Sequence, residues 1–300
     1  MFGPNKIFKD TININYCHRD PQFFKSFEEL TINFLEKFNL HEYDLLFVPG
    51  SGTVGIEALM FSLKRKIKSI GRTGVFQQRW DKMANHYNQF KNSDKYYNIY
   101  CQLETSLSHV NKIDGEIVDA ISAFPYYDIP KGCKFFITCS NKILSSYIGL
   151  SIVGVRKDCW EDLIDSSIQS YLNLARYKEM SYMCQTPSTA PTHIYSHLND
   201  VIKNLNISDL RSDIITNSKT VVDSVGRDNI VGEDLCPVIT LKENAIPFDV
   251  ANKFNLYGLH TGKKKYQIFT YSQDASDYRK FASVLNRYRV ELNKEFKKSA

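Results

Sequence analysis

The feature that most constrains this chain is the alternation of short apolar segments with helix-like segments over its first two hundred residues. The strand-like segments are apolar and bounded by turn residues, whereas the helix-like ones carry apolar residues three or four positions apart. Predicted strands cover residues 43–48, 97–103, 116–121, 134–139 and 149–155, and predicted helices cover 27–38, 54–63, 80–90, 162–175 and 192–205. Such alternation predicts an α/β fold with a largely parallel sheet.

The last hundred residues follow a different pattern. Residues 238–241 and 266–271 are strand-like, and residues 248–254 and 276–296 are helix-like. A chain of 300 residues is long enough for one large domain and a smaller one. We therefore predict a large domain over residues 1–195 and a small α+β domain over residues 196–300.

Composition narrows the class of protein. Hydrophobic residues make up 43% of the chain and charged residues 24%, the balance of a folded globule. The net charge of +5 comes with only short basic clusters at 64–68 and 263–265, which are typical of solvated faces rather than nucleic-acid grooves. Seven cysteines without a C-x-x-C pair indicate neither a disulfide framework nor a zinc site. With no apolar run near the roughly 18 residues of a membrane span, we expect a soluble cytoplasmic protein.

A glycine-rich turn, Gly50-Ser51-Gly52-Thr53, follows the first predicted strand and opens a helix. Glycines allow the backbone to approach an anion closely, and a helix start offers free N–H groups and the positive end of the helix dipole. The turn matches neither the dinucleotide G-x-G-x-x-G pattern nor a P-loop. It predicts a phosphate site, although short turns of this composition also occur without any ligand.

Asp119 and Lys142 lie at the ends of two apolar strands. A carboxylate that ends a buried strand is costly to leave unpaired, so Asp119 is either a cap or salt-bridge partner, or an acid that pairs with a protonated ring nitrogen. Burial lowers the pKa of a lysine, and an uncharged amine can form a Schiff base. Lys142 is therefore a candidate nucleophile, against the ordinary alternative of a solvated loop lysine.

Two further segments complete a possible ligand site. Phe76 lies between turn-prone and polar residues and could stack on a flat ring or simply fill the core. Residues 104–106, Glu-Thr-Ser, follow a predicted strand at the sheet edge where open α/β sheets bind ligands. A ligand with a phosphate, a flat ring, a ring nitrogen and an aldehyde would suit all these groups. Pyridoxal 5′-phosphate has these four features.

Seven segments resemble, in order, the class V aminotransferases, which are fold type I pyridoxal-phosphate enzymes. Within this class the sequence is most similar to the 2-aminoethylphosphonate–pyruvate transaminase-like proteins. The segments are C-H-R-D-P at 17–21, G-S-G-T at 50–53, T-G-V-F-Q-Q-R at 73–79, E-T-S at 104–106, V-D-A-I-S at 118–122, S-N-K at 140–142 and T-P-S-T-A-P-T-H at 186–193. Residues 256–269 also resemble the small domain of that family. The resemblance implies a mostly parallel sheet between helices, with a smaller C-terminal α+β domain.

The resemblance also implies a role for each matching residue. Lys142 would hold the cofactor as a Schiff base, Asp119 would keep the pyridine nitrogen protonated, and Phe76 would stack on the ring. The first 20 or so residues would form an arm near the active site, and the site would lie at a homodimer interface. The remaining implied contacts are Ser51, Gly52, Thr53 and Asn141 with the phosphate, Thr105 with the hydroxyl side of the ring, Thr189 with the phosphate of the partner subunit, and His18 and Arg19 with the substrate.

Two departures from the family pattern concern the substrate. Gln267 stands where the family usually has an arginine that clamps the acid group of the substrate. A neutral amide cannot form a bidentate charged pair with a carboxylate or phosphonate. The chain is also shorter than typical members, and Lys142 follows Asp119 by only 23 positions. Both departures indicate a different or more open substrate pocket.

Three hypotheses follow for function. The first is an aminotransferase that moves an amino group between an amine or amino acid, aminophosphonates included, and a keto acid. The second keeps the cofactor but changes the bond that breaks, as in a decarboxylase or lyase that acts on an unusual, even tethered, amino substrate. The third is a scaffold that keeps the fold without catalysis, against which stands the presence of Lys142, Asp119 and the glycine-rich turn.

Overall fold

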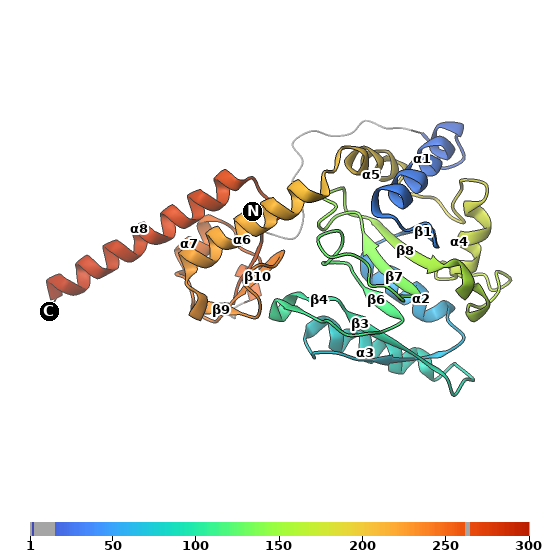
Figure 1. Cartoon of the computed structure of the whole chain (residues 1–300), viewed down its shortest axis with the longest axis horizontal. Coiled ribbons are helices and arrows are strands. Elements are labelled where there is room, and N and C mark those ends of the chain that lie inside the picture. Colours follow the sequence, from blue (N-terminus) through green and yellow to red (C-terminus); the bar gives the residue numbers. More distant parts are fainter. Residues whose placement is uncertain (1, 3–15, 262–264, 300) are drawn as a thin grey trace. The chain divides into compact units, whose positions relative to one another are not determined.

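A six-stranded sheet organises the larger of two units into which the chain folds (Figure 1). The structure is a computed structural model and describes Phe2, residues 16–261 and residues 265–299. Among these, the larger unit contains residues 16–104 and Asn111–Leu205, and the smaller unit contains Phe2, Thr105–Val110 and the residues from Asn206 onward. The predicted N-terminal arm falls largely on residues 3–15, which lie outside the described residues.

The sheet of the larger unit has the strand order β1-β8-β7-β6-β3-β2. Strands β2, β3, β6 and β7 pair in parallel, and β8 pairs antiparallel with both β7 and β1. All strands except β8 therefore point the same way, which confirms the predicted α/β fold. Their bounds are β1 (Tyr43–Pro49), β2 (Lys66–Ser69), β3 (Tyr96–Cys101), β6 (Ile117–Asp119), β7 (Phe135–Cys139) and β8 (Leu150–Arg156).

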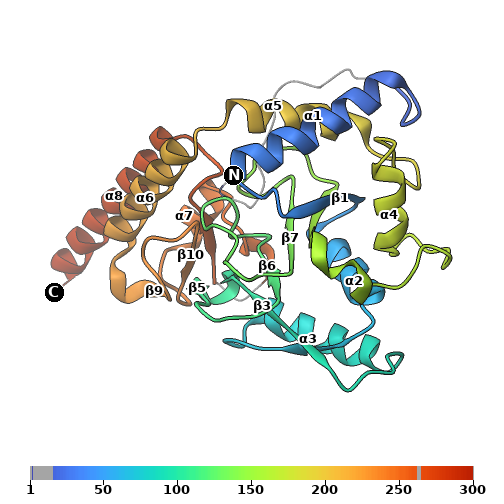
Figure 2. The same ribbon diagram turned by 45° about the vertical axis from the view of Figure 1, so that its right-hand side comes forward.

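Helices cover both faces of this sheet and bury one apolar core on each side. On one face, α1 (Pro21–Phe38) and α5 (Thr192–Asn204) lie side by side (Figure 2). On the other face lie α2 (Gly52–Ser62), α3 (Val75–Asn88) and α4 (Leu174–Ser181). The central strands β6, β7 and β8 are buried on both faces and mostly apolar, which is why they could be recognised from the sequence, whereas the edge strand β2, K-I-K-S, was not predicted.

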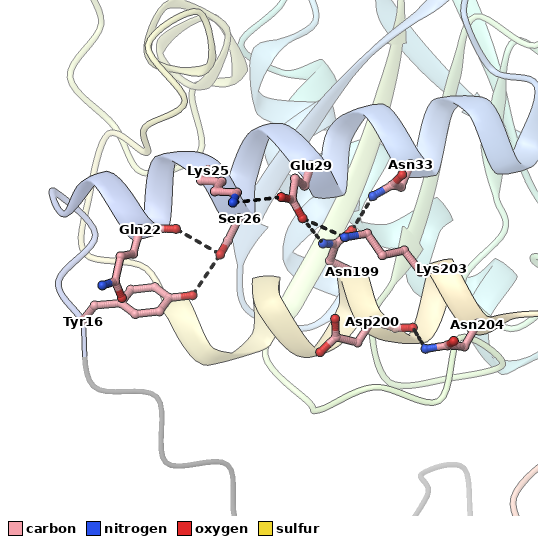
Figure 3. A network of polar contacts seen from close by, with 10 residues as sticks. All are labelled: Tyr16, Gln22, Lys25, Ser26, Glu29, Asn33, Asn199, Asp200, Lys203 and Asn204. Atoms are coloured by element: carbon pink, nitrogen blue, oxygen red, sulfur yellow. Dashed lines mark hydrogen bonds and ion pairs between the residues drawn. The ribbon is translucent and has the colours of Figure 1, made fainter.

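Helix α5 belongs to the larger unit because polar contacts bind it along α1. Figure 3 shows the Glu29 carboxylate accepting hydrogen bonds from Lys203 Nζ at 2.7 Å and from Asn199 Nδ2 at 3.0 Å. Asn33 Nδ2 donates to Asn199 Oδ1 at 2.8 Å. The predicted boundary between residues 195 and 196 falls inside α5, whereas the larger unit extends to Leu205.

The predicted helix over residues 162–175 is wrong. The segment begins with the end of a 3₁₀ helix, η2 (Lys157–Asp162), and continues without regular structure until α4. Side chains there bind nearby backbone amides: Asp165 Oδ1 accepts from Ser167 N at 2.9 Å, and Ser170 Oγ accepts from Leu172 N at 3.1 Å. Such local bonds compete with helix formation. Asn173 then caps α4 by accepting from the amide of Ala175.

The smaller unit is an α+β structure. Strand β10 (Val238–Leu241) lies between β9 (Ile230–Val231) and β11 (Gln267–Phe269), antiparallel to both. Its helices are α6 (Ile207–Val225), α7 (Phe248–Lys253) and α8 (Ala275–Ser299), of which α6 was not predicted. The short elements of this unit are η1 (Thr105–Leu107), β5 (His109–Val110), η3 (Arg227–Asn229) and η4 (Leu259–Thr261), whereas β4 (Leu103–Glu104) belongs to the larger unit. Among the described residues, no helix combines the length and the apolar composition needed to cross a lipid bilayer.

Candidate active site

A cavity of about 160 Å³ lies in the larger unit at the carboxyl ends of its parallel strands. This is the edge at which open α/β sheets bind their ligands. Seven of the residues singled out from the sequence meet there: Ser51, Gly52, Thr53, Phe76, Asp119, Asn141 and Lys142. The other lining residues are Trp80, Cys101, Leu103, Ile121, Ser122, Cys139 and Ile148.

The glycine-rich turn connects β1 to α2 and presents the first turn of that helix to the cavity. Gly50 has φ +134°, a conformation that L side chains rarely adopt, and its amide donates to the carbonyl of Gly149 at 2.8 Å. A Cβ on Gly52 would lie 2.6 Å from Ile121 Cδ1, so only glycine fits there without a shift. Ser51 is the N-cap residue, but its side chain makes no capping hydrogen bond. The amide groups of this first turn suit an anion.

Asp119 ends β6 and is almost fully buried, with 3% of its surface exposed. Its Oδ2 accepts a hydrogen bond from the indole Nε1 of Trp80 at 2.8 Å, and its Oδ1 accepts from the amide of Ile121 at 3.0 Å. Burial raises the pKa of Asp119 to about 6, and these two donors oppose that effect because they favour the charged carboxylate. The carboxyl group is therefore ionised at neutral pH, and a cationic N–H in the cavity would stabilise it.

Lys142 lies in a tight turn between β7 and β8. The amide of Ser145 donates to the Lys142 carbonyl at 2.8 Å, and the amide of Ser146 donates to the Ser140 carbonyl at 2.8 Å. Ser146 Oγ also lies 2.8 Å from Nδ1 of His197 on α5. These bonds fix the backbone that carries the lysine. Burial lowers the pKa of Lys142, which favours the uncharged, nucleophilic amine.

Helix α3 brings Phe76 to the cavity, and buried polar groups hold the start of this helix in place. The Glu104 carboxylate accepts from the amides of Phe76 at 3.1 Å and Gln77 at 2.9 Å. A Cβ on Gly74 would lie 2.2 Å from Cδ of Glu104, so the cap requires glycine there. Gln77 Oε1 in turn accepts from the amide of Cys101 at the end of β3, at 2.9 Å. Glu104, considered as a ligand contact from the sequence, thus serves as a helix cap.

The sequence analysis missed several residues of the cavity wall. Trp80 was counted only as the start of a helix, and its spacing of four residues from Phe76 was the signal that both could face one site. Cys101 and Cys139 are the last residues of β3 and β7, flanking the strand that carries Asp119. Burial raises the pKa of both thiols, so they are neutral neighbours of Asp119.

The other five candidate residues do not line this cavity of the larger unit as described. Thr105 and Gln267 belong to the smaller unit, where the Thr105 carbonyl accepts from Gln267 Nε2 at 2.5 Å. The guanidinium of Arg19 hydrogen-bonds the side chain of Gln185, and partial burial lowers the pKa of His18. Thr189 lies in the loop before α5 and is exposed. Their roles toward a ligand stay predictions.

Comparison with known proteins identifies the fold. No family model matches the chain, and no curated protein matches its sequence. Among solved structures, an aspartate aminotransferase of subgroup IV from Thermus thermophilus has a TM-score of 0.74 at 15% identity, over 94% of this chain and 98% of that one. A ureidoglycine–glyoxylate aminotransferase from Bacillus subtilis has a TM-score of 0.74 at 14% identity, over 97% and 92%. A pyridoxal-phosphate-bound phosphoserine aminotransferase from Trichomonas vaginalis has a TM-score of 0.71 at 14% identity, over 91% and 90%.

These likenesses extend over almost the whole of each chain, so they include both units. The predicted fold, a mostly parallel sheet between helices with a smaller α+β unit, is therefore confirmed as the fold of these aminotransferases. At such low identity the likeness concerns the fold. Function has to be argued from the residues of the cavity.

Proposed function

We propose that this protein is a pyridoxal-phosphate-dependent aminotransferase that moves an amino group between an amine or amino acid, aminophosphonates included, and a keto acid. The observation that carries the proposal is the meeting of three groups in one cavity: the Lys142 amine, the buried Asp119 carboxylate and the glycine-rich turn at the start of α2. Each suits a different part of the same cofactor. A solved neighbour, the phosphoserine aminotransferase from T. vaginalis, is described as bound to pyridoxal phosphate.

The cavity residues fit this cofactor on physical grounds. The turn at Gly50–Thr53 offers first-turn amides and two hydroxyl groups, and the space in front of Gly52 admits no side chain. Asp119 is a buried carboxylate with a donor on each oxygen, and a protonated ring nitrogen would neutralise its charge. Phe76 lines the same cavity and offers an aromatic face.

The chain's own residues would then act as follows. Lys142 Nζ would hold the cofactor covalently and, once displaced by the substrate amine, would carry a proton to and from the reacting carbon. Asp119 would keep the ring nitrogen protonated, and Phe76 would fix the plane of the ring. When bound, pyridoxal phosphate supplies the electron sink for the substrate carbon. The remaining proposed contacts are Ser51, Gly52, Thr53 and Asn141 with the phosphate, Thr105 with the ring hydroxyl side, Thr189 with the phosphate of the partner subunit, and His18, Arg19 and Gln267 with the substrate.

We further propose that the protein is a cytoplasmic homodimer. All seven cysteines are free, and five of them are more than nine-tenths buried at strand or core positions where their reduced form packs as a small apolar side chain. A reducing compartment suits such a set. The dimer follows from the resemblance of the Thr186–His193 segment to one that reaches a partner's cofactor.

The test is covalent trapping. Protein incubated with pyridoxal phosphate and then reduced with borohydride should carry a pyridoxyl group on the peptide that contains Lys142. Lys142→Ala should lose both the label and all turnover, whereas Lys157→Ala, a surface lysine whose Nζ donates to the His41 carbonyl, should keep both. A label at another lysine, or full activity of Lys142→Ala, would show the assignment to be wrong. Protein that takes up no cofactor would favour a non-catalytic scaffold.

A second candidate keeps the cofactor but changes the reaction to decarboxylation or elimination. Gln267 favours it, because its Nε2 group donates to the Thr105 carbonyl at 2.5 Å and to Thr240 Oγ1 at 3.0 Å. Both amide hydrogens are thereby used within the smaller unit, and no cationic clamp for an acid group stands at this position. Products separate the two reactions: carbon dioxide or a cleaved fragment formed without a keto acid would defeat the aminotransferase proposal.

A further inference from the structure

Trp80 is buried beside Asp119 but is not one of the residues proposed above to act on the cofactor or the substrate. It has no exposed surface, it lines the cavity, and its indole Nε1 lies 2.8 Å from Asp119 Oδ2. An indole N–H only donates hydrogen bonds, so it favours the charged carboxylate over the protonated acid. The contact therefore both orients the Asp119 carboxylate and favours its charged form.

Helix α3 links Trp80 to the aromatic ring expected to stack on the cofactor. Phe76 lies one turn earlier on α3, and the two ring centroids are 6.4 Å apart at an angle of 35°. Glu104 holds the first turn of this helix, and Gln77 ties it to the amide of Cys101. Cys101 is the register partner of Asp119 in the parallel pair of β3 and β6. One helix thus sets the position of Phe76 and of the donor to Asp119 together.

We propose that Trp80 is a positioning residue that holds the Asp119 carboxylate ionised and aimed at the ring nitrogen of the cofactor. This inference rests on the proposed function and names a residue through which the acid acts. The Asp119 pKa lies only a little below neutral pH, because burial raises it to about 6. The amide of Ile121 and the indole oppose this effect of burial. Removing one hydrogen bond to a charged group should raise this pKa by about one to two further pH units.

Other ionisable groups near Asp119 do not replace the indole. Cys101 and Glu104 approach from the side of β3, and Cys139 and Lys142 approach from the side of β7. Both thiols have raised pKa values and are neutral at physiological pH, and the Cys101 thiol lowers the pKa of Asp119 as a further hydrogen-bond donor, with a smaller effect than the indole. Glu104 raises the pKa of Asp119 further, and Lys142 is biased by burial toward the uncharged form.

The chain offers a matched control for the tryptophan. It has two tryptophans, and the other, Trp160, also donates from Nε1 to an aspartate, Asp44 Oδ2, at 2.6 Å. Trp160 does not line the cavity. Trp80→Phe and Trp160→Phe therefore make the same chemical change at two indole–carboxylate pairs, only one of which concerns the proposed site.

The binding experiment uses pyridoxamine 5′-phosphate, which lacks the aldehyde and so reports pairing of the ring without the covalent bond to Lys142. Its dissociation constant is measured from pH 5 to pH 9 for wild type, Trp80→Phe and Trp160→Phe. Wild type and Trp160→Phe should lose affinity below about pH 6. In Trp80→Phe, this loss of affinity should begin about one to two pH units higher. If a folded Trp80→Phe protein loses affinity at the same pH as wild type, the inference is overturned and the proposed function stays intact. Failure of wild type to bind overturns both.

A second measurement needs neither cofactor nor a Trp80 substitution. In Trp160→Phe, Trp80 is the remaining tryptophan, so the intrinsic fluorescence of the cofactor-free protein reports its surroundings. This fluorescence should titrate with a midpoint near pH 6 and lose that transition when Asp119→Asn is added. A transition that persists in the double variant, or a flat profile in Trp160→Phe, overturns the inference even if Trp80→Phe does not fold.

Discussion

Asp119 should make the cofactor-free protein less stable at neutral pH, so that removing its charge stabilises the fold while it damages the site. The pKa of this carboxyl is raised from 3.8 to about 6 in the folded state, with burial as the main cause. As pH rises through this interval, the unfolded chain loses its proton first, so the unfolded state becomes relatively more favourable. A shift of about two units corresponds to about 3 kcal/mol of stability that is present below pH 4 and lost by about pH 7.

Asp119→Asn removes this pH-dependent contribution. Its amide can still accept from one of the two donors, Trp80 Nε1 or the amide of Ile121, and the mismatch with the other costs about 1–2 kcal/mol at every pH. That cost cancels when the difference between variant and wild type is compared at two pH values. Between pH 4.5 and pH 8 the difference should move by about 2 kcal/mol in favour of the variant.

The assay is urea unfolding of cofactor-free wild type and Asp119→Asn at pH 4.5 and pH 8. Asp44→Asn is the matched control, because Asp44 also accepts from an indole but water still reaches its side chain, which is 31% exposed. It should show no comparable movement. A difference for Asp119→Asn that stays constant with pH, or that moves in favour of wild type, would refute the reasoning. In the same variant pyridoxal phosphate should bind more weakly, because a neutral amide cannot neutralise a protonated ring nitrogen.

Three further substitutions test the supports of the site. Gly52→Ala should cost about 1–3 kcal/mol in urea unfolding and weaken cofactor binding, and this cost should be smaller in an Ile121→Ala background, which lacks the Ile121 atoms at 2.6, 2.7 and 3.2 Å. Glu104→Gln should lower the free energy of unfolding by about 1–2 kcal/mol, because it weakens the charge-assisted cap on α3. The far-ultraviolet circular dichroism spectrum should show that the variant keeps its fold. Glu29→Gln should change stability by less than about 1 kcal/mol, since its contact with Lys203 is partly exposed; a larger loss would mean that the α1–α5 network is cooperative.

The parts of the fold that the sequence predicts are those determined locally. Strands β1, β7 and β8 are largely apolar segments between turn residues, and the glycine-rich turn and the turn with Lys142 follow β1 and β7. Because the carboxyl ends of parallel strands meet at one edge, the grouping of Asp119, Lys142 and the turn was predictable before any coordinates were known.

The parts that could not be predicted depend on contacts between distant segments. Helix α6 has apolar residues at helical spacing at both ends, such as Ile214 and Val221, but its buried face between and beside them also carries small polar side chains such as Ser218, whose hydroxyl donates to the Cys236 carbonyl at 2.9 Å. These polar residues interrupt the apolar stripe in the sequence. Likewise, Glu104 caps a helix that begins about thirty residues earlier, and Trp80 reaches an acid 39 residues away. Sequence spacing alone does not reveal such pairings.

The single reversed strand, β8, has a mechanical consequence for the site. The turn that carries Lys142 leads directly into β8, so β7, this turn and β8 form a hairpin. At the start of the returning strand, Gly149 accepts from the amide of Gly50, the first residue of the glycine-rich turn. The turn that carries Lys142 and the glycine-rich turn are thus both connected to the same hairpin. Under the proposed function, a movement of the turn that carries Lys142 would therefore be passed to the backbone proposed to bind the phosphate, and these two parts of the site would move together.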